Sequence, residues 1–154
     1  MTEAMKHALQ RGIQAEQDAY DFYRIAAQKV NNDALKETFQ NLAKDELNHR
    51  DFLTRLLESD DPLSVTIKAQ THDYRIAEEV ISETPNLWAD MPFSDAMALA
   101  VKREEAAMQT YEKLAAEASD PRLKELFTNL RNMEQAHKTA LETLYLNTAY
   151  AEVW

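Results

Sequence analysis

The sequence of 154 residues contains no cysteine, one glycine and four prolines. Because it has no cysteine, the chain forms no disulfide, performs no thiol chemistry and holds no cysteine-ligated iron–sulfur cluster or rubredoxin-type iron of its own. Strand-rich folds need glycine or proline turns every few residues, so the scarcity of both excludes such folds and favours long helices. We therefore expect an all-α protein in which residues 1–154 form a single domain.

The sequence also lacks long apolar runs and an excess of basic residues. No segment is apolar over the ~18 residues that a membrane helix needs, and no charged-then-apolar leader begins the chain, so we expect neither a membrane span nor a signal peptide. The net charge of −10 repels phosphate backbones, which argues against nucleic-acid binding. An acidic surface serves solubility or attracts cations. These absences indicate a cytoplasmic protein without nucleic-acid or membrane partners.

Apolar residues recur every three or four positions in four long segments, a spacing that predicts the packed helices of a four-helix bundle. Short connections at 31–33 and 119–121 join these helices into two hairpins, which we place at residues 3–58 and 94–146. Asp120 is expected to cap the fourth helix, with a proline at the first helical position.

The segment between the hairpins, residues 59–93, is expected to be a long crossover along the bundle. A structureless loop of that length is uncommon in a compact domain, and we place a short helix within it at about residues 74–82. Residues 147–154 are expected to form a C-terminal tail. A crossover of this kind also permits two chains to exchange hairpins, and we expect a homodimer.

The two hairpins are copies of one another. Residues 33–50 align with residues 121–138 without a gap, at an offset of 88 positions, and eight of the 18 pairs are identical. Ordinary composition gives about one identity in such an alignment. The same offset relates polar residues on the inward, otherwise apolar stripes of the four helices, namely Glu16 and Glu104, Glu46 and Glu134, and His49 and His137.

These six polar residues predict a dimetal site. An unpaired buried carboxylate is costly, and in practice it is protonated, pairs with a cation or binds a metal. No lysine or arginine lies on the inward stripes, so four carboxylates need another source of positive charge. Dimetal bundles use one glutamate from each of two helices and Glu-x-x-His from each of the other two. A single Glu-x-x-His is common by chance, and the alternative is a bundle that keeps these residues without a metal.

The spacing within the motifs assigns roles to the six residues. In each Glu-x-x-His motif the glutamate and the histidine are one helical turn apart. We therefore expect Glu46 and Glu134 to bridge two metals, while the histidine of each motif binds one metal. The glutamates of the first and third helices then remain as terminal ligands, one for each metal. Such ligands suit iron or manganese better than zinc or copper, and two such metals can share the two electrons that reduce a peroxide.

Three further residues lie beside these ligands. Tyr23 and Tyr111 are two turns beyond the terminal glutamates in the same stripes, so we expect them either to donate a hydrogen bond to a ligating carboxylate or only to pack. Asp45 precedes Glu46 and is expected to orient a histidine on the facing helix. The repeat places Met133 at the corresponding position, so the surroundings of the two metals are expected to differ.

The segments "AEQDAYDFY" and "DELNH" in the first hairpin, with "REEAAMQTY" and "MEQAH" in the second, resemble the rubrerythrin family of the ferritin-like di-iron superfamily. The resemblance covers residues 5–58 and 94–146. It implies a ferritin-like bundle with a non-haem di-iron centre, in which the six residues are catalytic metal ligands. It also implies the reduction of hydrogen peroxide to water, a response to oxidative stress, with electrons from a rubredoxin-like donor.

This chain departs from the family pattern. Typical rubrerythrins carry a four-cysteine rubredoxin domain, whereas this chain ends at Trp154 without a cysteine, so the electron donor is expected to be a separate protein. The family also has another glutamate one turn after the third-helix ligand, where this chain has Ala107, and Glu105 points about 100° away from Glu104. Because that extra carboxylate favours peroxide in the family, peroxide and dioxygen both remain candidate oxidants. Leu47 stands where bacterioferritins carry a haem-binding methionine, so no haem is expected.

Three functions are compatible with these patterns. The first is an oxidoreductase in which two iron ions, or manganese ions, react with hydrogen peroxide or dioxygen and are reduced again by an external donor. The second is a ferroxidase of the ferritin-like kind, which oxidises iron and passes it on or stores it. The third is a metal-free helical interaction module.

Overall fold

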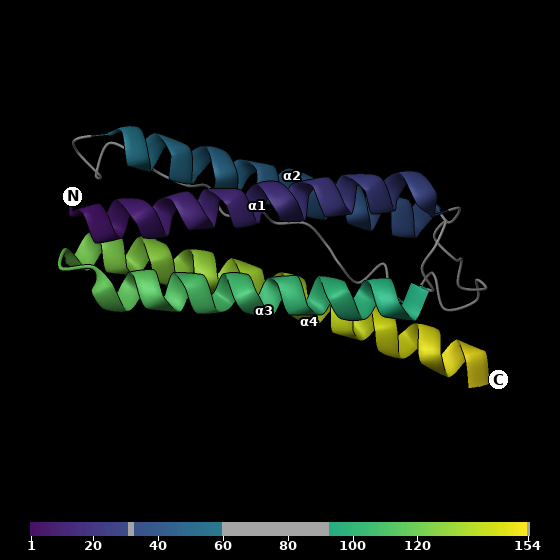
Figure 1. Ribbon diagram of the computed structural model, residues 1–154. Helices are drawn as coiled ribbons and strands as arrows, with labels where there is room; N and C mark the ends of the chain where they lie inside the picture. Colours follow the sequence, from purple (N-terminus) through teal and green to yellow (C-terminus); the bar gives the residue numbers. More distant parts are fainter. Residues whose placement is uncertain (31–32, 60–92, 154) are drawn as a thin grey trace.

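Four long helices account for nearly all of the residues that the structure, a computed structural model, describes; these residues are 1–30, 33–59 and 93–153. The helices are α1 (Glu3–Lys29), α2 (Asp33–Glu58), α3 (Phe93–Glu117) and α4 (Pro121–Val153). They lie side by side in a bundle of two antiparallel hairpins (Figure 1), and no described residue belongs to a strand. The prediction of an all-α four-helix bundle is confirmed. The expected crossover and its short helix lie outside the described residues.

The helix ends follow from local capping. The Thr2 hydroxyl oxygen accepts a hydrogen bond from the Met5 backbone N–H at 3.1 Å and caps α1. Asp120 Oδ1 accepts from the Arg122 backbone N–H at 2.9 Å, directly before Pro121 begins α4. Each such cap gives a hydrogen-bond partner to a backbone N–H that has none within the helix. The predicted cap of the fourth helix is therefore present.

Two helix boundaries differ from the predicted ones. Helix α3 begins at Phe93, one residue before the expected start. Helix α4 continues to Val153, so most of the segment that we separated as a C-terminal tail is helical. None of the described helices combines the length and the apolar composition that a bilayer span requires.

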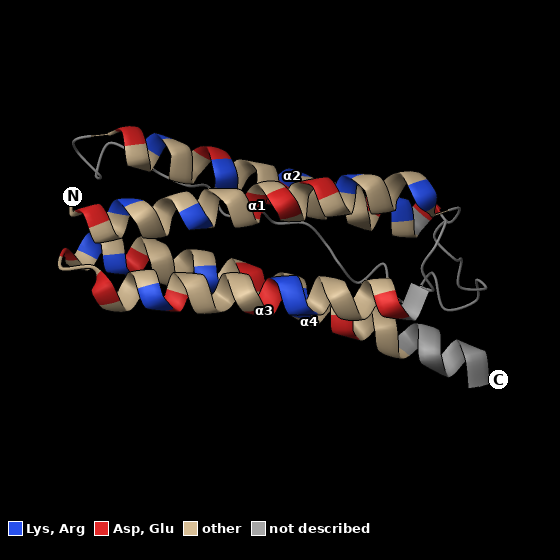
Figure 2. Ribbon diagram, viewed as in Figure 1, with Lys and Arg blue, Asp and Glu red and all other residues tan. Residues whose placement is uncertain are grey.

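The duplication is visible in the packing. Helix α1 packs along α2 and α3 along α4, while α1 and α3 bring the two hairpins together. Within the first hairpin Arg50 donates a hydrogen bond to Gln17 at 2.5 Å. At the repeat-related positions of the second hairpin, Lys138 pairs with Glu105 at 3.5 Å. Acidic and basic residues are interspersed along all four helices (Figure 2).

Two apolar clusters fill the bundle on either side of a polar middle. One cluster surrounds Tyr23 and Phe39, and the other surrounds Phe52 and Tyr111. In every helix, residues of one cluster precede the candidate ligands and residues of the other cluster follow them. The candidate ligands are thus held in the middle of the bundle with apolar packing at both ends.

Phe39→Ala and Phe127→Ala test the two clusters at repeat-related positions. Both rings are fully buried, with 0 % exposure. Each truncation should lower the free energy of unfolding by about 3–5 kcal/mol, because apolar burial is lost and a cavity remains. Urea unfolding followed by circular dichroism measures the change. The exposed-site variant Lys36→Ala is the control and should shift the same quantity by less than about 0.5 kcal/mol. A phenylalanine variant as stable as this control would contradict the packing described.

Candidate metal centre

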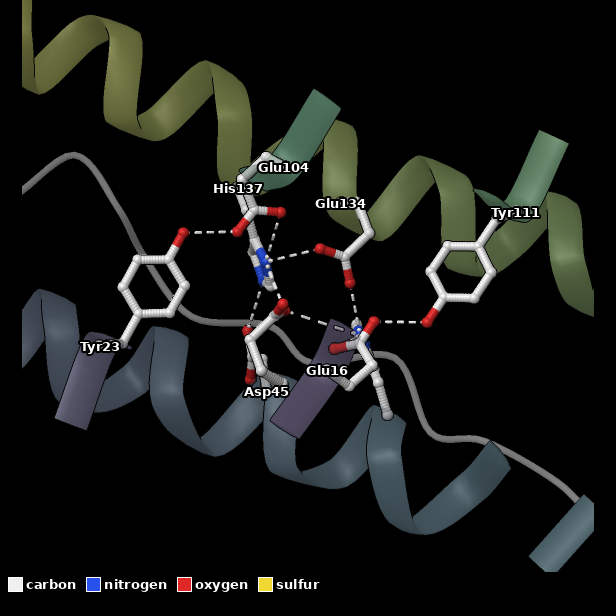
Figure 3. A network of polar contacts seen from close by, with 9 residues as sticks. Glu16, Tyr23, Asp45, Glu104, Tyr111, Glu134 and His137 are labelled. Atoms are coloured by element: carbon white, nitrogen blue, oxygen red, sulfur yellow. Dashed lines mark hydrogen bonds and ion pairs between the residues drawn. The ribbon is translucent and has the colours of Figure 1, made fainter. Parts of the chain in front are cut away.

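The polar middle of the bundle contains six buried side chains from all four helices. Each is at most 3 % exposed. Figure 3 labels Glu16, Glu104, Glu134 and His137, which converge between the helices. Helices α1 and α3 each contribute one glutamate, and α2 and α4 each contribute a glutamate and a histidine one turn apart, which places both on the same helix face. The six are Glu16, Glu46, His49, Glu104, Glu134 and His137.

The six side chains form two overlapping groups. In each group the candidate ligand atoms lie within 4.8 Å of one another. The glutamate of α1 and the histidine of α2 belong to one group, and the glutamate of α3 and the histidine of α4 belong to the other. Glu46 and Glu134 belong to both groups. Two shared carboxylates between two ligand groups are the arrangement that a carboxylate-bridged metal pair requires.

The shortest contacts of the histidines join the two hairpins. His49 Nδ1 lies 2.7 Å from Glu134 Oε1. His137 Nδ1 lies 3.0 Å from Glu46 Oε1. Each histidine thus faces the shared glutamate of the opposite hairpin, and the Nδ1 atom of each ring points towards the middle of the cluster.

The two tyrosines also reach across to the opposite hairpin. Tyr23 Oη donates a hydrogen bond to Glu104 Oε1 at 2.6 Å, and Tyr111 Oη donates to Glu16 Oε1. Burial raises the pKa of both tyrosines, and the charge of the glutamate that each contacts raises it further, so both hydroxyls stay protonated and act as donors. Of the two roles open from the sequence, the structure therefore shows hydrogen bonding, and it identifies the partners.

The surroundings of the two histidines differ. His137 Nε2 lies 2.9 Å from Asp45 Oδ2, a carboxylate on the facing helix α2. The repeat-related position holds Met133, which packs against the apolar cluster around Tyr111. A carboxylate on the outer nitrogen fixes the orientation of a histidine and makes it a stronger ligand. Of the two repeat-related residues Asp45 and Met133, only Asp45 offers a carboxylate to a histidine, and it contacts His137.

Each of the four glutamates keeps one buried carboxylate oxygen without a hydrogen-bond partner. A buried unsatisfied acceptor is costly, and more so when it is charged. Each of these oxygens lies 3.0–3.8 Å from a histidine nitrogen. Among the described residues, no lysine or arginine pairs with them. They are Glu16 Oε2, Glu46 Oε1, Glu104 Oε2 and Glu134 Oε2. This donor set fits a pair of divalent cations, which would satisfy all four oxygens together.

Without a metal, the centre retains protons. Burial raises the pKa of three of the glutamates, and neighbouring carboxylates raise it further. Burial also opposes ionisation of Glu134, but the neighbouring Glu104 and the two histidines hold its pKa well below the usual value. Burial disfavours a charged His49, yet its hydrogen bond to Glu134 and the nearby carboxylate of Glu16 raise its pKa to about 10. Because metals bind the deprotonated ligands, metal binding releases these protons.

The metal-free protein should lose stability as the pH rises from 6.5 towards 10. The pKa of His49 rises from 6.5 to about 10 on folding. Its contribution is therefore complete below pH 6.5 and is lost as the pH rises through about 10. The raised carboxyl pKa values act in the same direction above pH 4.5, and the lowered pKa of Glu134 acts only below pH 4.5. Urea unfolding in the presence of a chelator measures this profile.

The same chain loaded with Mn(II) is the control for that profile. A bound divalent metal replaces the protons, so the decline with pH should disappear or reverse. Both forms have the same surface charge, so the difference between their stability profiles reports on the buried centre alone. Parallel profiles for the two forms would show that the buried groups do not control the pH dependence.

Asp45→Asn should weaken one metal position more than the other. The substitution removes the negative charge beside His137 Nε2, and loss of such a partner lowers metal affinity by about 10–100-fold. The metal affinity at the His49 position should stay unchanged, because the residue related to Asp45 by the repeat is Met133, which has no carboxylate to lose. Calorimetric titration with Mn(II) would resolve the two steps, with Met133→Leu as the control. An equal loss in both steps would contradict this assignment.

Two residues that cover the centre were not expected from the sequence. The Arg103 guanidinium carbon lies 5.0 Å from the centre of the Phe22 ring, and that ring packs edge-on against Tyr23 with ring centres 5.4 Å apart. No sequence pattern marks this pair, because the contact depends on how α1 and α3 pack. The related positions hold Ala15 and Thr110, so the pair exists on only one side of the centre.

Comparisons with known proteins agree with this fold. The rubrerythrin family matches residues 7–145, a range that contains both hairpins' candidate ligands. No curated protein gives a match. Among solved structures, a hypothetical protein from Pyrococcus furiosus is similar, with a TM-score of 0.71 and 23 % identity over 95 % of this chain and 90 % of the other. At that identity the likeness shows the fold alone. The family match covers most of the chain, so the bundle is of the ferritin-like kind and the chain belongs to the rubrerythrin family.

Proposed function

We propose that the protein is a non-haem di-iron oxidoreductase that reduces hydrogen peroxide, or dioxygen, with electrons from an external donor. One observation carries the proposal. Two groups of buried oxygen and nitrogen ligands share Glu46 and Glu134, and their free carboxylate oxygens meet no lysine or arginine among the described residues. Carboxylate-rich ligands suit iron or manganese, and membership of the rubrerythrin family supports iron.

The six buried residues would hold the metal pair, and Glu46 and Glu134 belong to both ligand groups. A bound pair of Fe(II) ions would supply the two electrons that reduction of a peroxide requires. Each ligand group includes one histidine, which would contribute a neutral nitrogen ligand. Four ionised glutamates balance the four positive charges of two divalent ions, so the loaded centre carries no net charge inside an apolar bundle.

The remaining residues of the centre orient the ligands and hold protons. Tyr23 and Tyr111 each hold one oxygen of a terminal glutamate through the Oη–H donor, which leaves the other oxygen for a metal. Asp45 fixes His137 through Nε2. The apolar clusters at both ends exclude water from the polar middle. The electrons would come from a separate rubredoxin-like protein, and we propose that the chain acts as a homodimer in the cytoplasm.

A ferroxidase is the second candidate, because this chain has Ala107 where the family has an additional glutamate. Ala107 is 9 % exposed and belongs to an apolar cluster, so no carboxylate occupies the place of the extra family glutamate. Glu105 does not substitute for it, since its side chain is at the surface beside Lys138. Without that carboxylate, oxidation of Fe(II) by dioxygen becomes a competitive reaction of the same centre.

Anaerobic loading with two Fe(II) per chain, followed by rapid mixing with hydrogen peroxide or with dioxygen, tests the proposal. Faster oxidation by peroxide supports a peroxidase, and faster oxidation by dioxygen supports the ferroxidase. Glu104→Gln should abolish rapid oxidation and reduce the iron content, because it removes a buried ligand charge. Glu105→Gln is the matched control, one residue away and exposed, and it should retain both. A Glu104→Gln variant with unchanged iron content would favour the metal-free interaction module instead.

A further inference from the structure

The side of the bundle formed by α1 and α3 is distinct from the side formed by α2 and α4. Both histidines come from α2 and α4. Helices α1 and α3 therefore face the centre with carboxylates and tyrosines alone, namely Glu16, Glu104, Tyr23 and Tyr111. The line along which α1 packs against α3 is called the α1–α3 seam below. A molecule that enters the centre through this seam passes residues of two helices that contribute no histidine to the centre. The repeat gives this seam two equivalent positions, one at each tyrosine.

The position at Tyr23 is sealed by two large side chains. The Phe22 ring packs against Tyr23, and the Arg103 guanidinium lies over that ring. Arg103 Nε is buried, which places the side chain across the seam rather than out in solvent. Phe22 also packs against the apolar cluster around Phe39. This end of the seam is thus covered from helix to helix.

The equivalent position at Tyr111 lacks both of these large side chains. Thr110 replaces the ring, and its hydroxyl donates back to the Ala106 carbonyl oxygen at 3.0 Å, within its own helix. Ala15 replaces the arginine and is exposed. A surface hollow of about 420 Å³ lies at this part of α1 and α3, lined in part by Arg11, Ala106 and Thr110. Its lining also includes the small Ala8 and the buried Leu114, so the side chains here are on average smaller than the phenylalanine and arginine of the other position.

The hollow lies near the Glu16 half of the centre, because Thr110 is one of its lining residues. Thr110 precedes Tyr111, whose hydroxyl donates to Glu16. Ala107 is one turn before both residues on α3 and is 9 % exposed, and Glu16 itself is 2 % exposed. The centre is therefore closed on this side. Displacing the side chain of Thr110 disturbs fewer packed atoms than moving a phenylalanine and an arginine.

We infer that small oxidants reach the centre through the α1–α3 seam beside Thr110, and that the Phe22–Arg103 pair closes the equivalent path on the other side. The rim of the hollow includes Arg11 and Lys113, whose charges repel metal cations but not a neutral peroxide or dioxygen molecule. The path would thus admit the oxidant rather than the metal. The identity of the oxidant rests on the proposed function, whereas the path itself does not.

Single cysteines test the path, because the chain has none of its own. Ala107 and Ala19 are repeat-related, and they are similarly buried at 9 % and 6 % exposure. Ala107→Cys lies on the side of Thr110, and Ala19→Cys lies on the side of the Phe22–Arg103 pair. In the metal-free folded chain, methyl methanethiosulfonate, a small neutral thiol reagent, should label Ala107→Cys at least about tenfold faster than Ala19→Cys. Rates in urea correct for intrinsic thiol reactivity.

Exchanging Phe22 and Thr110, called the wall residues below, should exchange the labelling rates of the two cysteines. Thr110→Phe added to Ala107→Cys should slow its labelling to the rate of the sealed side, and Phe22→Thr added to Ala19→Cys should accelerate that site. Circular dichroism verifies that each variant is folded. If Thr110→Phe prevents folding, the labelling rate of Ala19→Cys with and without Phe22→Thr still tests the path. Equal rates at the two cysteines, or rates that do not respond to the wall residues, would overturn the path.

The same variants separate this inference from the proposed function. In the iron-loaded chain with native alanines, Thr110→Phe should slow oxidation by peroxide at least about tenfold while iron content stays unchanged. If labelling follows the wall residues but neither oxidant oxidises the iron, the oxidoreductase proposal fails and the path stands. If oxidation is rapid and labelling ignores the wall residues, the path fails and the oxidoreductase stands.

Discussion

The structure depends on one electrostatic constraint, the neutralisation of four carboxylates inside an apolar bundle. Glu46 and Glu134 are almost fully buried and have no lysine or arginine among their described partners. Such groups are tolerated only if protons or metal ions compensate them. In the metal-free state, raised pKa values of carboxyl and imidazole groups keep the protons in place. The apolar clusters at both ends make the constraint strict, because they exclude the water that would otherwise solvate these charges.

The close contacts of the centre described above also hold the two hairpins together. His49 contacts Glu134, His137 contacts Asp45, and each tyrosine donates to a glutamate of the opposite hairpin. Each hairpin contributes ligands to both groups. Binding of a metal pair would therefore stabilise the docking of one hairpin on the other, and loss of the metals would loosen the same interface. Ligand binding and tertiary structure are coupled through the same atoms.

The helices and the six buried residues could be predicted because two independent patterns agree. Apolar periodicity gives the helices, and the offset of 88 positions distinguishes Glu46 and His49 from a chance Glu-x-x-His. The partners of the tyrosines could not be predicted, because periodicity places Tyr23 on an inward stripe without giving the rotation of the opposite hairpin. The extent of α4 to Val153 was missed because the apolar spacing becomes irregular after Leu144. The Arg103–Phe22 contact joins separate helices, and such pairs depend on how α1 and α3 pack.

The duplication has a consequence for the electronic properties of the two positions. A strictly symmetric bundle would hold two equivalent ions, and both would gain or lose an electron equally easily. Asp45 beside His137, with Met133 at its repeat-related position, breaks that equality, because a negative charge near one imidazole makes it the stronger electron donor. A redox-active metal ion held by His137 would then be harder to reduce than one held by His49. The two sides of the bundle would thus differ in how easily they give up an electron.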